Sequence, residues 1–389
     1  MIRPIPARHR QHSYSWNIVI FMGHFLFLEP FYGGSHKYFA DGLVKNSKHT
    51  IELLTLPDRF WKWRMRGASL YFIEKVMDFS IYDGIITSNM LSLADLKAIS
   101  REDLPPIAVY FHENQILYPL SPGEKEDLHY GFTDITSALS ADHVIFNSEF
   151  HKNAFINELP AFLKRFPDYN PIWVIDEIRN KTTVLYPGCR LNQLSEKKQE
   201  INTPPLIIWN HRWEHDKNPE DFFQALFKID EEGIDFQLAV LGEQYKTSPE
   251  IFNVARKKLQ KKIVHWGFIE TYQDYRKWLE DGDIVISTSF QENFGISIVE
   301  AIGSGNFPLL PDRLSYREII PPRFHKLCLY KNQNDLISKL KKLIQYYDVN
   351  LSVELSNENL RFSWKTMIIH YDNFLDDIRN TGKEKNPAI

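Results

Sequence analysis

Several features are scarce in this 389-residue sequence, and each scarcity excludes a class of protein. The two cysteines, Cys189 and Cys328, form no close-spaced pair, which argues against a disulfide framework or a zinc site and fits a reducing cytosol. The formal net charge is −4, so any contact with nucleic acid needs a local basic patch. No Gly-x-Gly-x-x-Gly follows a predicted strand, which argues against a nicotinamide dehydrogenase.

Long apolar runs are also missing, since no segment reaches the ~20 apolar residues that a membrane-spanning helix needs. The basic residues 1–13 and the apolar run 18–28 superficially resemble a signal peptide. However, the run contains His24 and ends at Glu29 without a small-residue cleavage site. We interpret it as the first strand of a sheet after a dispensable tail, with Met22 as an alternative start. The sequence thus predicts a cytoplasmic protein without a membrane contact.

What the sequence does contain is two successive series in which short apolar runs alternate with helical patterns. Short apolar runs bounded by turn residues indicate buried parallel strands, and two such series indicate two doubly wound sheets. We predict an α/β protein with two Rossmann-like domains, residues 1–193 and 204–365, that face each other across a cleft. Residues 194–205 form a polar linker, and 366–389 form a helix and tail that can cross back to the first domain. The predicted strands are 25–28, 51–56, 84–88, 107–111, 142–147, 183–186, 206–209, 237–241, 263–266, 284–287 and 308–310.

Two motifs follow predicted strands in the first half. Gly33 and Gly34 let the backbone approach a bound group closely, and the helix that follows offers free N–H donors to an anion. A simple tight turn is the alternative. Residues 110–114 contain His112, Glu113 and Asn114 directly after a buried strand, where a polar cluster is not typical of a core. His112 could bond to a substrate hydroxyl or exchange a proton.

Two further motifs follow strands in the second half. Arg212 and Lys217 lie at the entry to a helix, where a fork of donors and a mobile point charge suit a diphosphate. Solvated surface charge is the alternative. Glu292 lies on a loop and Glu300 on the helix after it, and carboxylates suit vicinal sugar hydroxyls because each accepts several hydrogen bonds. Gly295 lies where this helix begins, so that backbone N–H groups there can hold phosphate.

A short aromatic and basic segment, residues 59–66, combines cations with aromatic rings. This combination suits stacking on unstacked bases and pairing with phosphates, so it predicts a contact with RNA. The alternative is an amphipathic helix that covers the core while its cations reach water. The cations are Arg59, Lys62, Arg64 and Arg66, and the rings are Phe60, Trp61 and Trp63.

Together these motifs resemble family 4 glycosyltransferases with the GT-B fold. Five sequence motifs are more specific and resemble those of the tRNA-queuosine mannosyltransferase family. They lie at residues 31–37, 63–72, 111–115, 211–217 and 265–267. The resemblance covers residues from about 25 to 364. It implies a retaining transfer of mannose from GDP-mannose to queuosine in the anticodon of a tRNA, without a further cofactor and without a metal.

Carried over residue by residue, the resemblance implies that Arg212 and Lys217 neutralise the donor diphosphate and that Glu300 holds the ribose. With His112 and Glu292, these two cations would form the catalytic set. His112, Gly33 and Gly34 would face the sugar and diphosphate from the first domain. Gly267 and Phe268 would flank the base. The other implied donor-binding residues are Gly242, Asn293, Phe294, Gly295 and Ile296. The implied acceptor and tRNA residues are His36, Arg59, Trp61, Lys62, Trp63, Arg64, Arg66, Glu113 and Asn114.

Two other functions are compatible with the same motifs. A related mannosyl- or glucosyltransferase that acts on a lipid or polysaccharide would use residues 60–72 as a membrane-facing helix. A non-catalytic RNA-binding protein with the same fold would have lost the phosphate cations or the carboxylates of the second domain, and this sequence retains all of them.

Overall fold

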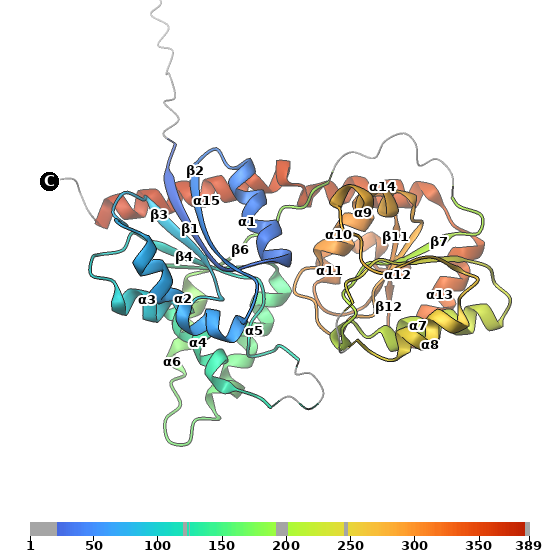
Figure 1. Cartoon of the computed structure of the whole chain (residues 1–389), viewed down its shortest axis with the longest axis horizontal. Coiled ribbons are helices and arrows are strands. Elements are labelled where there is room, and N and C mark those ends of the chain that lie inside the picture. The colour runs from blue at the N-terminus through green and yellow to red at the C-terminus, as the bar shows by residue number, and fades with distance from the viewer. Residues whose placement is uncertain (1–21, 120–122, 124, 192–200, 245–247, 386–389) are drawn as a thin grey trace, which may run out of the picture.

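The computed structural model describes residues 22–119, 123, 125–191, 201–244 and 248–385. It has two lobes, each built on a six-stranded parallel sheet (Figure 1). Residues 1–21 and most of the predicted linker lie outside the described residues, so the predicted tail and the boundary between 193 and 204 stay predictions.

The first sheet has the strand order β2-β1-β3-β4-β5-β6. Its order reverses between β1 and β3, which is the topological switch point where open α/β sheets bind ligands. The strands are β1 (His24–Tyr32), β2 (Thr50–Pro57), β3 (Gly84–Ser88), β4 (Ile107–Phe111), β5 (His143–Phe146) and β6 (Thr182–Val184). The helices are α1 (Gly34–Asn46), α2 (Trp61–Lys75), α3 (Leu93–Ile99), α4 (Leu128–Ser140), α5 (Glu149–Leu163) and α6 (Trp173–Asn180).

The second sheet has the order β12-β11-β10-β7-β8-β9, with its switch point between β7 and β10. Its strands are β7 (Leu206–Trp209), β8 (Gln237–Val240), β9 (Ile263–Trp266), β10 (Ile284–Ile286), β11 (Phe307–Pro311) and β12 (Leu329–Tyr330). Around them lie α7 (Pro219–Glu231), α8 (Ile251–Lys258), α9 (Tyr272–Asp281), α10 (Ile296–Gly303), α11 (Tyr316–Ile319), α12 (His325–Cys328), α13 (Gln333–Gln345), α14 (Val349–Asn359) and the short 3-10 turns η1 (His215–Lys217), η2 (Pro322–Phe324) and η3 (Leu360–Phe362).

The last helix, α15 (Trp364–Lys385), runs back along the first lobe (Figure 1). Its buried face, which includes Trp364, Tyr371 and Ile378, shares a core with Phe25 and Phe27 of β1. The helix therefore completes the apolar cover of the first sheet, although it follows the whole second series in the sequence.

The predicted strands are found, with one correction that affects the site. The first strand does not end at Leu28 but continues to Tyr32, and its register with β2 shifts between Glu29 and Tyr32. Glu29 is therefore part of the buried strand, and its carboxylate needs internal partners. Several short or polar elements were not predicted, among them β12 and α14, whose buried residues pack into the core of the second lobe.

Candidate active site

The residues that follow strand ends in the two lobes contact each other. The Nδ2 of Asn293, after β10, donates to the carbonyl of His112, after β4, at 3.2 Å. Tyr38 of α1 donates its hydroxyl to Glu300 of α10 at 2.8 Å. Both sheets thus turn their carboxyl ends toward one interface, which is where doubly wound sheets bind ligands.

Lys217 and Arg212 both follow β7, but their surroundings differ. Lys217 is buried, and its Nζ donates to the carbonyl of Gln291 at 2.8 Å and lies 3.1 Å from Asp216 and 3.4 Å from Glu292. Burial opposes its charge, but the two carboxylates raise the pKa of Lys217 above its usual value. Arg212 is exposed, with Nη2 3.0 Å from Glu214. The pair therefore offers one fixed and one accessible cation.

The segment between Glu292 and Glu300 forms the start of α10. Gly295 precedes the helix with φ = +97°, a conformation that favours glycine. The first N–H groups of α10 have no acceptor within the helix and remain available to an anion. Phe294 is buried against Tyr186 and Phe362, so only its backbone can reach a ligand.

Glu300 is buried and bonded to two tyrosines. Its Oε1 accepts from Tyr38 at 2.8 Å and from Tyr272 at 3.3 Å. Burial is the main reason that the pKa of Glu300 rises to about 7, while the two tyrosines and Arg190 act in the opposite direction. A carboxylate that already accepts hydroxyl donors has the geometry to accept those of a sugar.

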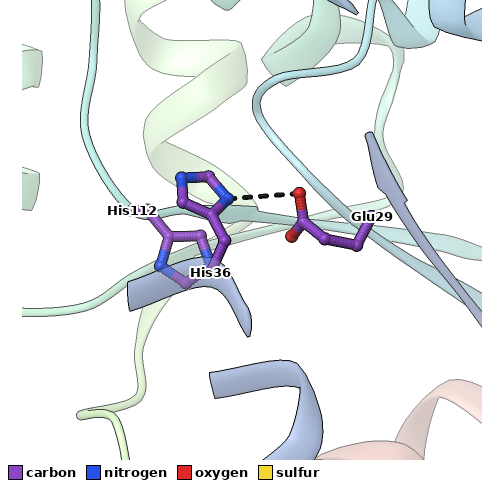
Figure 2. A group of neighbouring side chains, drawn as sticks. All are labelled: Glu29, His36 and His112. Carbon is purple, nitrogen blue, oxygen red and sulfur yellow. Dashed lines mark hydrogen bonds and ion pairs between the residues drawn. The ribbon is translucent and has the colours of Figure 1, made fainter. Parts of the chain in front are cut away.

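A compact polar cluster lies at the switch point of the first sheet. His36 Nδ1 lies 3.2 Å from Glu29, and His36 Nε2 lies 3.4 Å from Glu113. Figure 2 shows the His36 and His112 rings next to each other, and their centroids are 4.0 Å apart with the planes tilted by 31°. The Glu29 carboxylate also accepts from Ser88 of β3 at 2.9 Å, so the cluster ties together the two strands of the switch point.

The charges in this cluster follow from its contacts. Burial lowers the pKa of His36, but Glu29 and Glu113 more than offset this and raise it to about 10, so His36 is an imidazolium at neutral pH. Burial, with the charge of His36, holds the pKa of His112 well below its usual value. His112 is therefore neutral, and its Nε2 has no partner among the described residues. This nitrogen is available for a substrate hydroxyl.

A metal could in principle share the ligand atoms of Glu29, His36 and His112, which lie within 4.8 Å of one another. In this arrangement, however, both nitrogens of His36 face carboxylates. A histidine that is protonated on both nitrogens has no lone pair for a metal. The contacts of His36 therefore fit an ion-paired imidazolium.

The turn between β1 and α1 lies beside the start of the aromatic and basic segment. A Cβ atom on Gly33 would lie 1.9 Å from Asp58 Oδ2, so only glycine fits against the loop that leads into α2. Gly34 has φ = +49° and open space beside its Cα. This contact holds the loop before α2 against the turn between β1 and α1.

The aromatic and basic segment forms the exposed first turns of α2. Trp63 is 76% exposed, and Phe60 is exposed as well. Trp61 packs against Tyr130 of α4 at 4.9 Å between ring centroids. Arg64 folds back so that its Nε donates to the carbonyl of Pro57 at 3.3 Å, whereas Arg59, Lys62 and Arg66 are exposed. This surface therefore combines accessible rings with accessible cations.

The remaining residues that the sequence predicted for the site differ in their exposure and contacts. Gly242 is buried, and a Cβ there would lie 1.6 Å from the carbonyl oxygen of His211. Gly267 and the exposed Phe268 follow β9, with Gly267 at φ = +128°. Asn114 is buried and its Oδ1 accepts from the Leu117 N–H at 2.9 Å, so its side chain shapes the loop and does not present a surface to tRNA.

Sequence reasoning missed several residues of this interface. Glu29 could have been found as a lone acid at the end of an apolar run. Nothing in the local sequence marks Tyr38, Tyr118 or Tyr272, because a tyrosine in a helix or loop is common. Tyr118 interacts with the Arg212 guanidinium, and because these residues are 94 positions apart only the fold brings them together.

Solved structures share this architecture. A sucrose-phosphate synthase of Thermosynechococcus elongatus matches with a TM-score of 0.71 at 12% identity, over 92% of this chain and 100% of that one. The HepE protein of Anabaena, solved in complex with UDP, matches with a TM-score of 0.65 at 15% identity, over 91% and 100% of the two chains. The expected GT-B fold is thus confirmed.

Sequence relatives are more specific. The model of the tRNA-queuosine alpha-mannosyltransferase N-terminal region matches residues 24–189, and the model of group 1 glycosyl transferases matches residues 192–359. A tRNA-queuosine alpha-mannosyltransferase of Drosophila melanogaster is 37% identical over 329 residues, which span 82% of this chain and 86% of that protein. The resemblance predicted from the motifs is confirmed, and the chain is a glycosyltransferase that belongs to the tRNA-queuosine alpha-mannosyltransferase family.

Proposed function

We propose that this enzyme transfers mannose from GDP-mannose, with retention, to the queuosine nucleoside in the anticodon of a tRNA. One observation carries the proposal. Two cations suited to phosphate (Arg212 and Lys217) and two carboxylates (Glu292 and Glu300) of the second lobe lie at the interface with the neutral His112 of the first lobe. In support, the curated Drosophila relative bears the name of this activity. The two free cysteines suit a reducing compartment, and we propose that the enzyme acts in the cytoplasm.

On the donor side, stabilisation of the leaving group should dominate the rate. GDP departs with developing negative charge, and Arg212, Lys217 and the N-terminus of α10 lie where preorganised donors would stabilise it. We assign the ribose to Glu300 and the sugar hydroxyls to Glu292 and His112. These groups come from both lobes, so closure of the lobes around the donor would assemble the site.

On the acceptor side, we assign the vicinal diol of the queuosine ring to Glu113, whose carboxylate faces the His36 imidazolium. The exposed rings and cations at the start of α2 would contact the anticodon loop, since RNA is recognised mainly through unstacked bases and phosphates. None of the helices in the described part of the chain is long and apolar enough to cross a bilayer.

Incubation of the protein with queuosine-containing tRNA and a panel of nucleotide sugars tests the proposal. We expect a hexose mass shift on the nucleoside with GDP-mannose, and none with the same tRNA that carries guanosine in place of queuosine. Transfer from a UDP-sugar alone would overturn the donor assignment. Transfer to lipid or polysaccharide acceptors, with none to tRNA, would overturn the acceptor assignment.

The exposed cations of α2 give a separate prediction. Replacing Lys62 and Arg66 together by glutamine should weaken tRNA binding and lower the slope of log affinity against log salt by about 1–2, because each lost phosphate contact lowers this slope by roughly 0.7–0.9. Filter binding between low and moderate salt measures it. Replacing the equally exposed Lys257 and Lys258 at the end of α8 provides the control, and an equal effect of both pairs would contradict the assignment.

A further inference from the structure

Glu300, the carboxylate that we assign to the donor ribose, is held by a residue of the opposite lobe. The hydroxyl of Tyr38, on α1, donates to Glu300 Oε1 at 2.8 Å. The Tyr38 oxygen in turn accepts the backbone N–H of Arg190 at 2.6 Å. The hydroxyl of Tyr272, from the same lobe as Glu300, reaches the same carboxylate oxygen at 3.3 Å. Two aromatic hydroxyls therefore occupy one oxygen of the carboxylate.

Arg190 contacts both of the tyrosines that bond to Glu300. Its guanidinium lies 4.7 Å from the Tyr38 ring centroid and 4.8 Å from that of Tyr272, so it contacts both rings. Arg190 belongs to the segment that leaves the first lobe, Tyr38 to the first helix of that lobe, and Tyr272 to the second lobe. Glu300 itself is only 6% exposed. The cluster therefore covers the carboxylate with groups from both lobes.

A ribose that places both vicinal hydroxyls on Glu300 needs both carboxylate oxygens, and Oε1 already accepts from two tyrosines. Each carboxylate oxygen accepts about two hydrogen bonds, so Oε1 has no site left for a ribose hydroxyl. One tyrosine hydroxyl has to leave Oε1, and Tyr38 can leave it without a rearrangement inside the second lobe, because Tyr38 belongs to the first.

We propose that Tyr38 occupies the position on Glu300 that the donor ribose takes, so that donor binding has to break a contact between the lobes. The proposal rests on the assignment of the ribose to Glu300. A second donor-binding group also faces a tyrosine of the first lobe, since the Arg212 guanidinium interacts with Tyr118. Donor binding exchanges the Tyr38 hydroxyl on Glu300 for a ribose hydroxyl.

The variant Tyr38→Phe tests the exchange, because it keeps the ring against Arg190 and removes only the competing hydroxyl. The affinity of GDP is measured by isothermal titration calorimetry for the wild type and the variant, and then repeated with 2′,3′-dideoxy-GDP. We expect the variant to bind GDP about tenfold more tightly, the scale of one hydrogen bond to a charged group. The dideoxy nucleotide should bind equally to both proteins, because it has no hydroxyl to place on Glu300.

Tyr82→Phe is the matched control. Its hydroxyl donates to the Glu52 carboxylate at 2.8 Å within the first lobe, away from the donor groups. GDP affinity should not change in this variant. Equal unfolding temperatures for Tyr38→Phe and the wild type establish that the fold is intact.

Unchanged or weaker GDP binding by Tyr38→Phe would overturn the exchange. An equal gain for GDP and dideoxy-GDP would also overturn it, since Tyr38 would then block the interface without competing for Glu300. Failure of the underlying assignment looks different. If Tyr38→Phe, in which the Tyr38 hydroxyl no longer competes, binds GDP and dideoxy-GDP equally well, Glu300 does not hold the ribose, and if the wild type binds no GDP, the proposed donor is wrong.

Discussion

Replacing Arg212 by alanine is expected to lower kcat for mannosyl transfer by about 10²–10³-fold, the scale observed when one preorganised donor to a developing charge is removed. Lys217→Ala should have an effect of at least this size. The physical reason is that GDP leaves as an anion, and both cations follow β7, with Lys217 in contact with Gln291 and Glu292 just before α10. Single-turnover rates with GDP-mannose and saturating tRNA measure the chemical step directly.

The two variants should differ in stability. Arg212 is exposed, so its removal should leave the fold intact. Lys217 is buried between Asp216 and Glu292, and its loss leaves two carboxylates near each other without their shared cation, which destabilises a buried site. Lys228→Ala, on the exposed face of α7, is the control for both measurements. Near-wild-type turnover in both site variants would refute the role of this pair.

Trp364→Ala is expected to lower the free energy of unfolding of the first lobe by about 3–5 kcal/mol, the usual cost of removing a buried tryptophan. Trp364 is 6% exposed and packs onto two glycines. A Cβ on Gly42 or on Gly188 would lie 2.2 Å from the indole. The Trp364 side chain therefore packs between α1 and the segment after β6 and holds α15 against both. Guanidinium unfolding, followed by circular dichroism, measures the loss.

The exposed Trp63 on α2 provides the matched control for Trp364. Trp63→Ala should change the free energy of unfolding by less than about 0.5 kcal/mol, because an exposed residue has few contacts to lose. It should instead weaken tRNA binding. If the two tryptophan variants unfold at the same denaturant concentration, α15 does not stabilise the first lobe in the way its packing indicates.

The local sequence was enough to predict the strands and the main site motifs. A parallel strand buried on both faces must be continuously apolar, so β3, β4 and β7 stand out as apolar runs. The polar residues that follow them, such as His112 and Arg212, must lie at the carboxyl edge of a sheet, where ligands bind. Gly295 was also recognised locally, because it falls where a helix begins and the N–H groups there can hold phosphate, and the structure adds its left-handed backbone conformation.

Only the tertiary structure decided which side chains meet and what charges they carry. The imidazolium of His36 depends on Glu29 and Glu113, and the neutral state of His112 depends on burial beside that imidazolium. Tyr38 and Glu300 are 262 positions apart, and their contact exists only because the two sheets face each other. Periodicity along a chain specifies which face of a strand or helix is buried, but it does not specify the partner. Partners, and therefore pKa values and interdomain contacts, are set by how distant segments pack.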